Sequence, residues 1–347
     1  MGAVFSGTPL GYGVGMLVGG RLADLLPPRR LCWAAIALFT VGLAIAFLLP
    51  SGFTFVVFYA MLGLGIGGGL AMAGSLAAGA YLFPTRVGAV GGALTATYAA
   101  GGLIQLPIAT QLAPALGWLA ALRVLGVASA VVAALLLLLL PAVPRPLRAH
   151  VEERVTLGRL FVRPRVWTGF LLQALSASVG TYAFLTIAGY AREHGLGLAV
   201  ATGAVTVAAA GNVLARAAAG AASDRFGVDA VLLAVLGSNL LAAGGFAAGG
   251  SSVFGVVLGS VAAGAGFGGT AGLNSKAGSL SAPDAPNTSF GVHFAGFSVG
   301  ALAGPLVGSA MGGGALSWLA VGAPSLVGLA VVLARAATTR AAGPGPG

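Results

Sequence analysis

The sequence predicts an all-α membrane protein with two helical bundles. Of its 347 residues, 58% are hydrophobic and only 7% are charged, whereas soluble domains carry roughly 25% charged residues. The mean hydropathy is +1.01. A soluble globule cannot hide so much apolar surface from water, but a lipid bilayer solvates it on every side. One long polar connection then divides the apolar segments into two groups.

Apolar windows of about 20 residues, interrupted by charges or by Pro, Gly and Ser clusters, predict eleven transmembrane helices. Their expected ranges are 3–23, 31–49, 53–80, 87–110, 118–140, 166–189, 198–222, 229–248, 252–273, 289–311 and 316–336. The first range is not preceded by the positive region of a signal peptide, so we interpret it as mature structure.

The central connection, from Pro141 to Arg165, holds six arginines and separates five spans from six. The expected organisation is therefore an N-terminal bundle (1–141), a central loop (142–165), a C-terminal bundle (166–337) and a tail (338–347).

Basic residues gather on one side of the predicted membrane. Alternating the spans puts fourteen of the 17 basic residues on one side and only Arg192 on the other. Cytoplasmic connections carry the excess of Lys and Arg in membrane proteins. We therefore expect a multi-pass protein of the cell membrane with residue 1 outside and the C-terminus in the cytoplasm.

Several function classes lack the residues that they need. The net charge of +10 is explained by topology, and no basic and aromatic interleaving suggests nucleic acid. There is no Gly-x-x-x-x-Gly-Lys-Ser/Thr loop, no His-Glu-x-x-His motif and no pair of carboxylates facing one cavity. The single cysteine, Cys32, excludes an internal disulfide. We expect no enzyme activity, no catalytic residues, no metal and no cofactor.

Two Gly-x-x-x-Asp motifs stand at the ends of the first and seventh spans. The first begins at Gly20 and ends at Asp24, and the second runs from Gly220 to Asp224. Glycine permits close helix contact one turn before a carboxylate, which can cap a neighbouring helix or pair with an arginine. Such a pair of contacts is a latch between moving parts. The alternative is an ordinary helix exit with a charge at the membrane surface.

This arrangement resembles the major facilitator superfamily, whose signature Gly-x-x-x-Asp-Arg/Lys-x-Gly-Arg/Lys-Arg/Lys follows helix 2 and recurs after helix 8. The second copy keeps Gly220, Asp224, Arg225 and Gly227. The first copy has Leu25 and Pro27 where the signature has a basic residue and glycine, but Arg29 and Arg30 preserve its basic end.

The resemblance covers the whole chain and implies the major facilitator fold. It makes the eleven spans helices 2–6 and 7–12, which leaves helix 1 without a counterpart. We expect the missing helix to lie upstream in a longer reading frame. The motif residues Gly20, Asp24, Arg29, Arg30, Gly220, Asp224, Arg225 and Gly227 then become the gating candidates.

Arg216 is the candidate for binding substrate. It precedes Asp224 by eight residues, which is about 12 Å of helix rise into the membrane. An unpaired arginine at this depth costs at least about 2.5 to 3.5 kcal/mol, so it should face a water-filled cavity and a partner. All seven acidic residues fall in connections or at helix ends. An anionic substrate would supply the missing charge. The alternative is a structural arginine bonded to backbone carbonyls.

Two segments are similar to the monocarboxylate transporter and oxalate/formate antiporter families. The Asn212-x-x-x-Arg216 spacing matches their helix 8, where this arginine binds the substrate carboxylate. Tyr81 and Arg86 match their motif at the start of helix 5, together with Ala89, Gly91 and Ala93. The resemblance implies that Arg216, Asn212 and Tyr81 bind substrate. The aspartate that couples protons in some relatives falls on Asn212, which cannot titrate.

His293 is a further candidate. It lies about one turn into the tenth span, and imidazole titrates near neutral pH. The alternative is a hydrogen-bonded packing residue.

We therefore expect a secondary transporter that moves a small organic anion, such as a monocarboxylate, by alternating access. H+ or a counter-anion is the expected coupling ion, antiport is the expected mode, and the protein should be a monomer in the lipid bilayer. Two alternatives remain open: a drug or metabolite exporter of the same fold, with a structural Arg216, and a truncated membrane protein that does not transport.

Overall fold

The computed structural model describes residues 2–139, 157–249 and 252–341, and these residues form helices without any strand. The N-terminal half contains α1 (Gly2–Ala23), α2 (Pro28–Leu48), α3 (Gly52–Thr54), the π-helical η1 (Phe55–Gly67), α4 (Gly68–Leu82), α5 (Val87–Leu116) and α6 (Trp118–Leu139). The C-terminal half contains α7 (Leu157–Phe161), α8 (Pro164–Glu193), α9 (Gly197–Phe226), α10 (Val228–Ala248), α11 (Val253–Ser281), α12 (Pro286–Ala310) and α13 (Gly314–Ala341).

Ten helical segments within the described residues are long and apolar enough to cross a membrane. The sequence predicted eleven, and the difference is α1. This helix has 22 residues, but its glycines, Thr8 and Pro9 dilute its apolar character. The segment α3–η1–α4 forms one span of 31 residues, as the window 53–80 predicted.

The ends of the helices follow local sequence signals. Proline occupies the first turn of α2, α8 and α12, where its missing N–H costs nothing. Ser51 and Thr54 form a reciprocal capping box at α3, with 3.1 and 3.0 Å between each side-chain oxygen and the opposing backbone nitrogen. Gly117 follows α5 with φ +78°, a conformation that favours glycine. α5 therefore extends to Leu116, beyond the predicted limit of 110.

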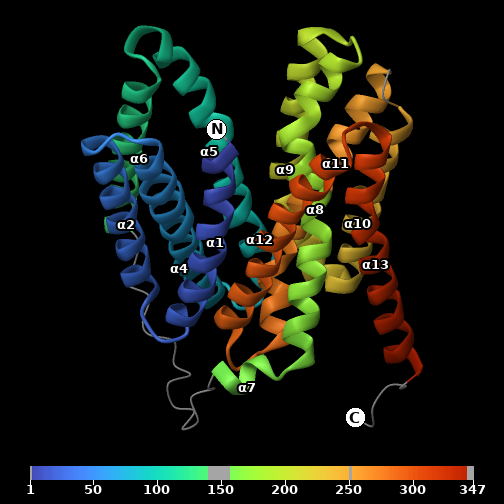
Figure 1. Ribbon diagram of the computed structural model, residues 1–347. Coiled ribbons are helices and arrows are strands. Elements are labelled where there is room, and N and C mark those ends of the chain that lie inside the picture. The colour runs from blue at the N-terminus through green and yellow to red at the C-terminus, as the bar shows by residue number, and fades with distance from the viewer. Residues whose placement is uncertain (1, 140–156, 250–251, 342–347) are drawn as a thin grey trace.

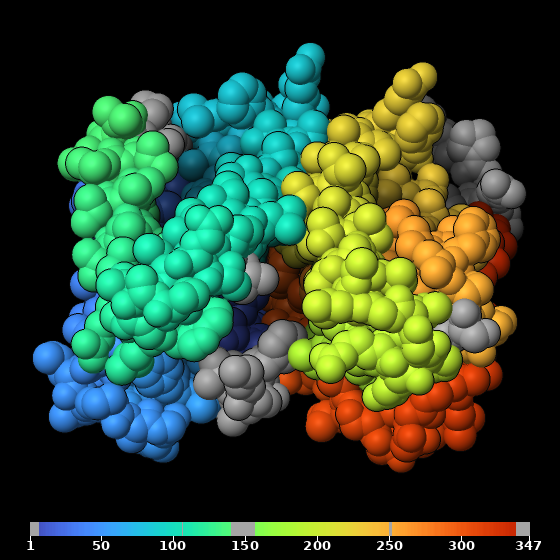
Figure 2. Space-filling model, turned by 90° about the horizontal axis from the view of Figure 1, so that it is seen from above, coloured from blue at the N-terminus to red at the C-terminus, as the bar shows by residue number. Residues whose placement is uncertain are grey.

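The two halves stand side by side and touch at one end (Figure 1). This end, which we call the basic end, holds the last turns of α1 and α9 and the first turns of α5 and α12, and α13 also finishes there. Contacts between the halves join α1 to α12 and α5 to α9. Seen from the opposite end, the surface is hollowed between the halves, with atoms of α12 visible at depth (Figure 2).

Close helix packing within the C-terminal half depends on glycine. Gly300 and Gly304 of α12 face α8 so closely that a Cβ at either position would overlap a backbone oxygen, of Ala174 or Ser178. Glycine removes the atom that would hold the helices apart, which is how small residues act in membrane helix contacts.

We expect Gly304→Ala to destabilise the protein by about 1 to 3 kcal/mol, because the added methyl group forces α12 away from α8. Gly189→Ala is the matched control, since a Cβ at Gly189 meets nothing within 4 Å. Thermal unfolding of the two purified variants checks this. Equal melting temperatures would contradict the packing role of Gly304.

The predicted central loop, 142–165, is only partly a loop. Residues 142–156 lie outside the described residues, while α7 forms at Leu157–Phe161 and α8 begins at Pro164. Between these helices, Arg163 donates two parallel hydrogen bonds to the Asp284 carboxylate, at 2.5 and 2.6 Å. Trp167 Nε1 also donates to Phe161 O, at 2.6 Å. The start of α8 is thereby tied to the connection between α11 and α12.

The hydrogen bonds from Arg163 hold the pKa of Asp284 below its ordinary value of 3.8. A carboxylate with a lowered folded-state pKa stabilises the protein above that ordinary value, and the contribution is lost as the pH falls through the folded pKa. Both side chains are about one-third exposed, so the effect is modest.

We therefore expect Asp284→Asn to lower the melting temperature slightly at pH 6 and to have no effect well below pH 4, where Asp284 itself is protonated. Thermal melts of both proteins across this range test the ion pair. A difference that persists unchanged at the acidic limit would contradict it.

Candidate functional site

Asp24 joins the two halves at the basic end. It follows α1 directly, and its Oδ1 accepts from Asn287 N and Nδ2, at 3.3 and 2.9 Å. Its Oδ2 accepts from Thr288 N and Oγ1, at 2.8 and 2.6 Å. Asn287 and Thr288 lie in the first turn of α12, whose own N-cap residue makes no side-chain capping bond. A carboxylate from the N-terminal half thus caps a helix of the C-terminal half.

Asp224 forms the matching contact in the opposite direction. From α9, it accepts from Gly88 N at 3.1 Å and from Ala89 N at 2.8 Å, both in the first turn of α5. Lys276 of α11 adds an ion pair, with 3.1 Å between Nζ and Oδ1. Of the two partners that the sequence suggested for the paired aspartates, the structure shows the helix N-terminus at both sites.

The glycine of each motif lies where the halves meet. A Cβ at Gly20 would overlap Asn287 O, and a Cβ at Gly220 would overlap Gly88 O. Gly220 is also close to Gly92, one turn further along α5. The spacing Gly-x-x-x-Asp therefore lets one turn of helix make a backbone contact and a cap to the same neighbouring helix.

The other motif residues lie around these contacts. Arg29 and Arg30 stand in the first turn of α2, and the Arg225 guanidinium lies 5.1 Å from the centre of the Phe226 ring. Gly227 separates α9 from α10 with φ +84°, which a side chain would strain. These residues shape the basic end without joining the halves through any contact described above.

Arg216 is buried between the halves, with 5% of its surface exposed. Its Nε donates to Asn212 Oδ1 at 3.0 Å, and one terminal nitrogen donates to Thr95 O of α5 at 3.3 Å. These bonds use two of the five N–H donors of the guanidinium. No carboxylate among the described residues pairs with it, so its charge is compensated only by neutral groups.

Aromatic side chains from both halves surround Arg216, and we call this group the aromatic cluster. Its members are Tyr12 of α1, Tyr98 of α5, Phe267 of α11, and Phe294 and Phe297 of α12. The rings contact one another with centroids 5.0 to 5.5 Å apart. The guanidinium lies 6.0 Å from the centre of the Phe267 ring.

The two tyrosines connect the cluster to Arg216 and to solvent. Both interact electrostatically with the guanidinium. The Tyr12 hydroxyl is buried and makes no hydrogen bond within the described residues, whereas Tyr98 is 47% exposed. An exposed ring beside a buried one means that open space reaches this depth, in agreement with the hollow in Figure 2. A buried polar atom without a partner is costly unless a ligand or water supplies one.

Sequence reasoning identified Arg216 and Asn212 at this site but missed Tyr12, Tyr98 and Thr95. A signal was present for the tyrosines, because the chain has only six and these two fall within predicted spans. Thr95 contributes only its backbone carbonyl, so its residue type carries no signal.

The structure does not bring Tyr81 or His293 to Arg216. Tyr81 is in the last two residues of α4, at the basic end, and 38% of it is exposed. His293 is fully buried inside the C-terminal half, where its imidazole lies against Gly169 of α8.

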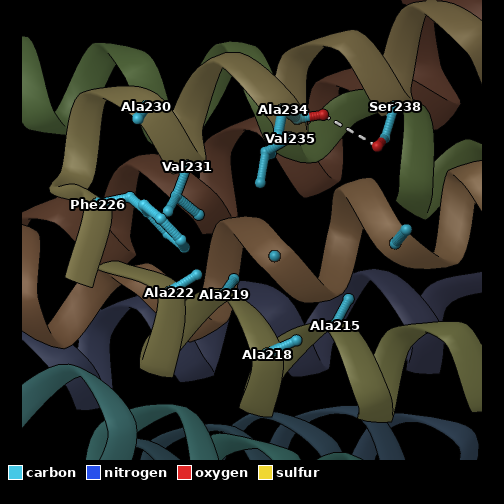
Figure 3. A pocket seen from close by; sticks show the side chains of 12 residues that line it. Ala215, Ala218, Ala219, Ala222, Phe226, Ala230, Val231, Ala234, Val235 and Ser238 are labelled. Carbon is cyan, nitrogen blue, oxygen red and sulfur yellow. Dashed lines mark hydrogen bonds between the residues drawn. The ribbon is translucent and has the colours of Figure 1, made fainter. Parts of the chain in front are cut away.

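A second concave surface, of about 420 Å³, lies between α9, α10 and α11 (Figure 3). Alanines make up most of its lining, and the hydroxyl of Ser238 is bonded back to Ala234 O at 2.9 Å. This surface offers no free polar group to orient a charged substrate. In addition, no group of three or more His, Cys, Asp or Glu among the described residues could hold a metal ion.

The comparison with known families decides the identity of the fold. The sequence profile of the Major Facilitator Superfamily matches residues 1–294, most of the chain. The chain belongs to the major facilitator superfamily. Its helices are those of a transporter fold, and no curated protein sequence matches it.

Solved structures of this superfamily share the fold across nearly the whole chain. FucP in its outward conformation aligns with a TM-score of 0.70 and 15% identity, covering 96% of this chain and 89% of that one. The human organic anion transporter MFSD10 aligns at 0.64 and 18% identity, covering 95% and 83%. The nucleoside transporter NupG aligns at 0.60 and 15% identity, covering 96% and 90%. Identities this low establish the fold and leave the substrate open.

Proposed function

We propose that this major facilitator protein transports a small organic anion with one carboxylate, and that Arg216 binds the carboxylate. The observation that carries the proposal is a buried guanidinium between the halves, bonded only to neutral groups and with N–H donors to spare. A desolvated positive charge is stabilised most by an anion.

The surrounding side chains favour a monocarboxylate. The aromatic cluster gives the site apolar walls, and the Tyr12 hydroxyl is placed to hydrogen-bond a polar substituent. No second cation is described beside Arg216, and a dicarboxylate would bury its other charge without a partner. Asn212 fixes the guanidinium through Nε and cannot titrate, so H+ coupling would need a different group and counter-anion exchange would need none.

The caps made by Asp24 and Asp224 support alternating access. We infer that they close the basic end while the hollow between the halves opens the other end. Transport then requires both caps to break as the halves rock around the Arg216 site.

Uptake into proteoliposomes tests the substrate class. Lactate or pyruvate should exchange across the membrane, whereas succinate, a neutral sugar and a nucleoside should not. Uptake of the sugar or the nucleoside without uptake of any carboxylate would overturn the proposal.

One observation favours a second candidate, an exporter of neutral or cationic compounds in which Arg216 is structural. The guanidinium donates to the Thr95 backbone carbonyl across the two halves, so it supports packing in this conformation. In that case carboxylates would neither be transported nor compete with the exported compound.

The positive-inside rule also predicts the orientation. We expect the basic end, with the C-terminal part of α13 that contains Arg335, to lie in the cytoplasm and the connection near Arg192 to lie outside. Reporter fusions at both positions measure this. A C-terminal fusion that is active only on the outer side would contradict the topology.

A further inference from the structure

The C-terminal half contains a cavity of about 490 Å³ at the basic end, separate from the Arg216 site. Five helices of this half enclose it: α8, α10, α11, α12 and α13. Its polar lining includes Arg165, Thr168, Gln173, His293 and Arg335. The transport mechanism proposed above uses none of these side chains.

The charges around the cavity favour an anion. Arg165 and Arg335 line it from α8 and α13. Arg335 pairs with Asp229 of α10, with 3.3 Å between the charged atoms, while Arg165 is exposed and makes no described ion pair. One positive charge therefore remains in excess. The first turns of α8 and α10 also border the cavity, through Pro164 and Val228, and helix N-termini attract anions.

Two buried side chains supply the independent evidence for a ligand. His293 is completely buried, and neither ring nitrogen has a hydrogen-bond partner among the described residues. Gln173 is 3% exposed, and its Oε1 also lacks a partner while its Nε2 donates to Thr270 O at 3.3 Å. Buried polar atoms without partners are rare in native structures, because each costs free energy.

The position of His293 is built into the fold. A Cβ at residue 169 would overlap the imidazole, so Gly169 provides the space that the ring occupies. The histidine is thereby held at the wall of the cavity and not in the contact between the halves.

We propose that this cavity binds a phosphate group through Arg165, Arg335 and His293. Guanidinium groups match phosphate oxygens with parallel N–H donors, and a histidine ring adds one more. Basic pockets between membrane helices at the cytoplasmic surface bind anionic lipid headgroups, so the headgroup of an anionic phospholipid and a soluble phosphate are the two sources.

Thermal stability of the purified protein in detergent tests the proposal without any transport measurement. The probes are inorganic phosphate, a short-chain phosphatidic acid and, as controls, potassium chloride at equal ionic strength and a short-chain phosphatidylcholine. We expect phosphate and phosphatidic acid to raise the melting temperature, and the two controls to leave it unchanged. Stabilisation by phosphatidic acid at much lower concentration assigns the lipid headgroup, and equal potency assigns a soluble phosphate.

Arg165→Gln and His293→Gln should each weaken the stabilisation by about tenfold in probe concentration, since each removes a hydrogen bond to a charged group. Arg165 is exposed, so its variant should fold normally even where His293→Gln does not. Arg192→Gln, at the opposite end, is the matched control. Two results would overturn the proposal: no stabilisation beyond the chloride control, or an equal response in the parent and in Arg165→Gln.

Discussion

Replacing Arg216 with lysine is expected to reduce carboxylate uptake at least about tenfold, and Arg216→Ala at least about a hundredfold. Lysine keeps the positive charge but loses the planar pair of donors that matches a carboxylate. It also cannot reproduce both bonds from a single guanidinium, to Asn212 Oδ1 and to Thr95 O. Alanine removes the charge as well.

The control for these variants is Arg123→Lys. Arg123 also bonds a backbone carbonyl, Phe47 O at 3.2 Å, and lies over an aromatic ring, but it does so within the N-terminal half. Uptake by this variant should match the parent. If Arg216→Lys instead lowers the yield of folded protein while the remaining folded fraction transports normally, Arg216 is structural.

Removing the Asp224 carboxylate is expected to open the basic end. Asp224→Ala leaves Gly88 N, Ala89 N and Lys276 without their shared acceptor, and bonds to charged groups are among the stronger ones in proteins. Because these bonds cross between the halves, they stabilise only the conformation in which the basic end is closed. The closed population should fall at least about tenfold relative to the open one.

A buried cysteine can report this opening. In a Cys32→Ser background, Ser223→Cys places a thiol at a position that is 1% exposed beside Gly88. Its labelling by a polar maleimide should be slow in the parent and at least about tenfold faster with Asp224→Ala. Asp229→Ala is the control, because Asp229 pairs with Arg335 inside one half. Equal acceleration by both substitutions, or none by Asp224→Ala, would contradict the latch.

The course of the chain could be predicted largely from local sequence. Apolar length and breaks at charged or glycine-rich segments located the described helices to within a few residues for most spans. The largest error was at α5, which continues past Gln111 and Pro114 to the turn at Gly117. A local reading treats this polar segment as a connection, whereas the helix ends only where a positive φ is adopted.

Contacts between distant segments could not be predicted in the same way. The Gly-x-x-x-Asp spacing indicated a close contact and a cap, but only the tertiary structure identifies α12 and α5 as the capped helices. His293 and Phe294 show why site membership was harder. These neighbours on α12 point in different directions, with His293 against Gly169 of α8 and Phe294 against Tyr12 of α1. A lone residue in an apolar helix with little amphipathic pattern gives no indication of which neighbour it meets.

Binding of carboxylates to purified protein tests the central claim most directly, because it separates the Arg216 site from the coupling and direction of transport. The measurement is the shift in melting temperature of the parent and of well-folded Arg216→Lys across monocarboxylates, dicarboxylates and neutral analogues. We predict that monocarboxylates alone stabilise the parent and that this stabilisation disappears in Arg216→Lys. Unchanged stabilisation by monocarboxylates in that variant would contradict the assignment of Arg216 as the carboxylate ligand.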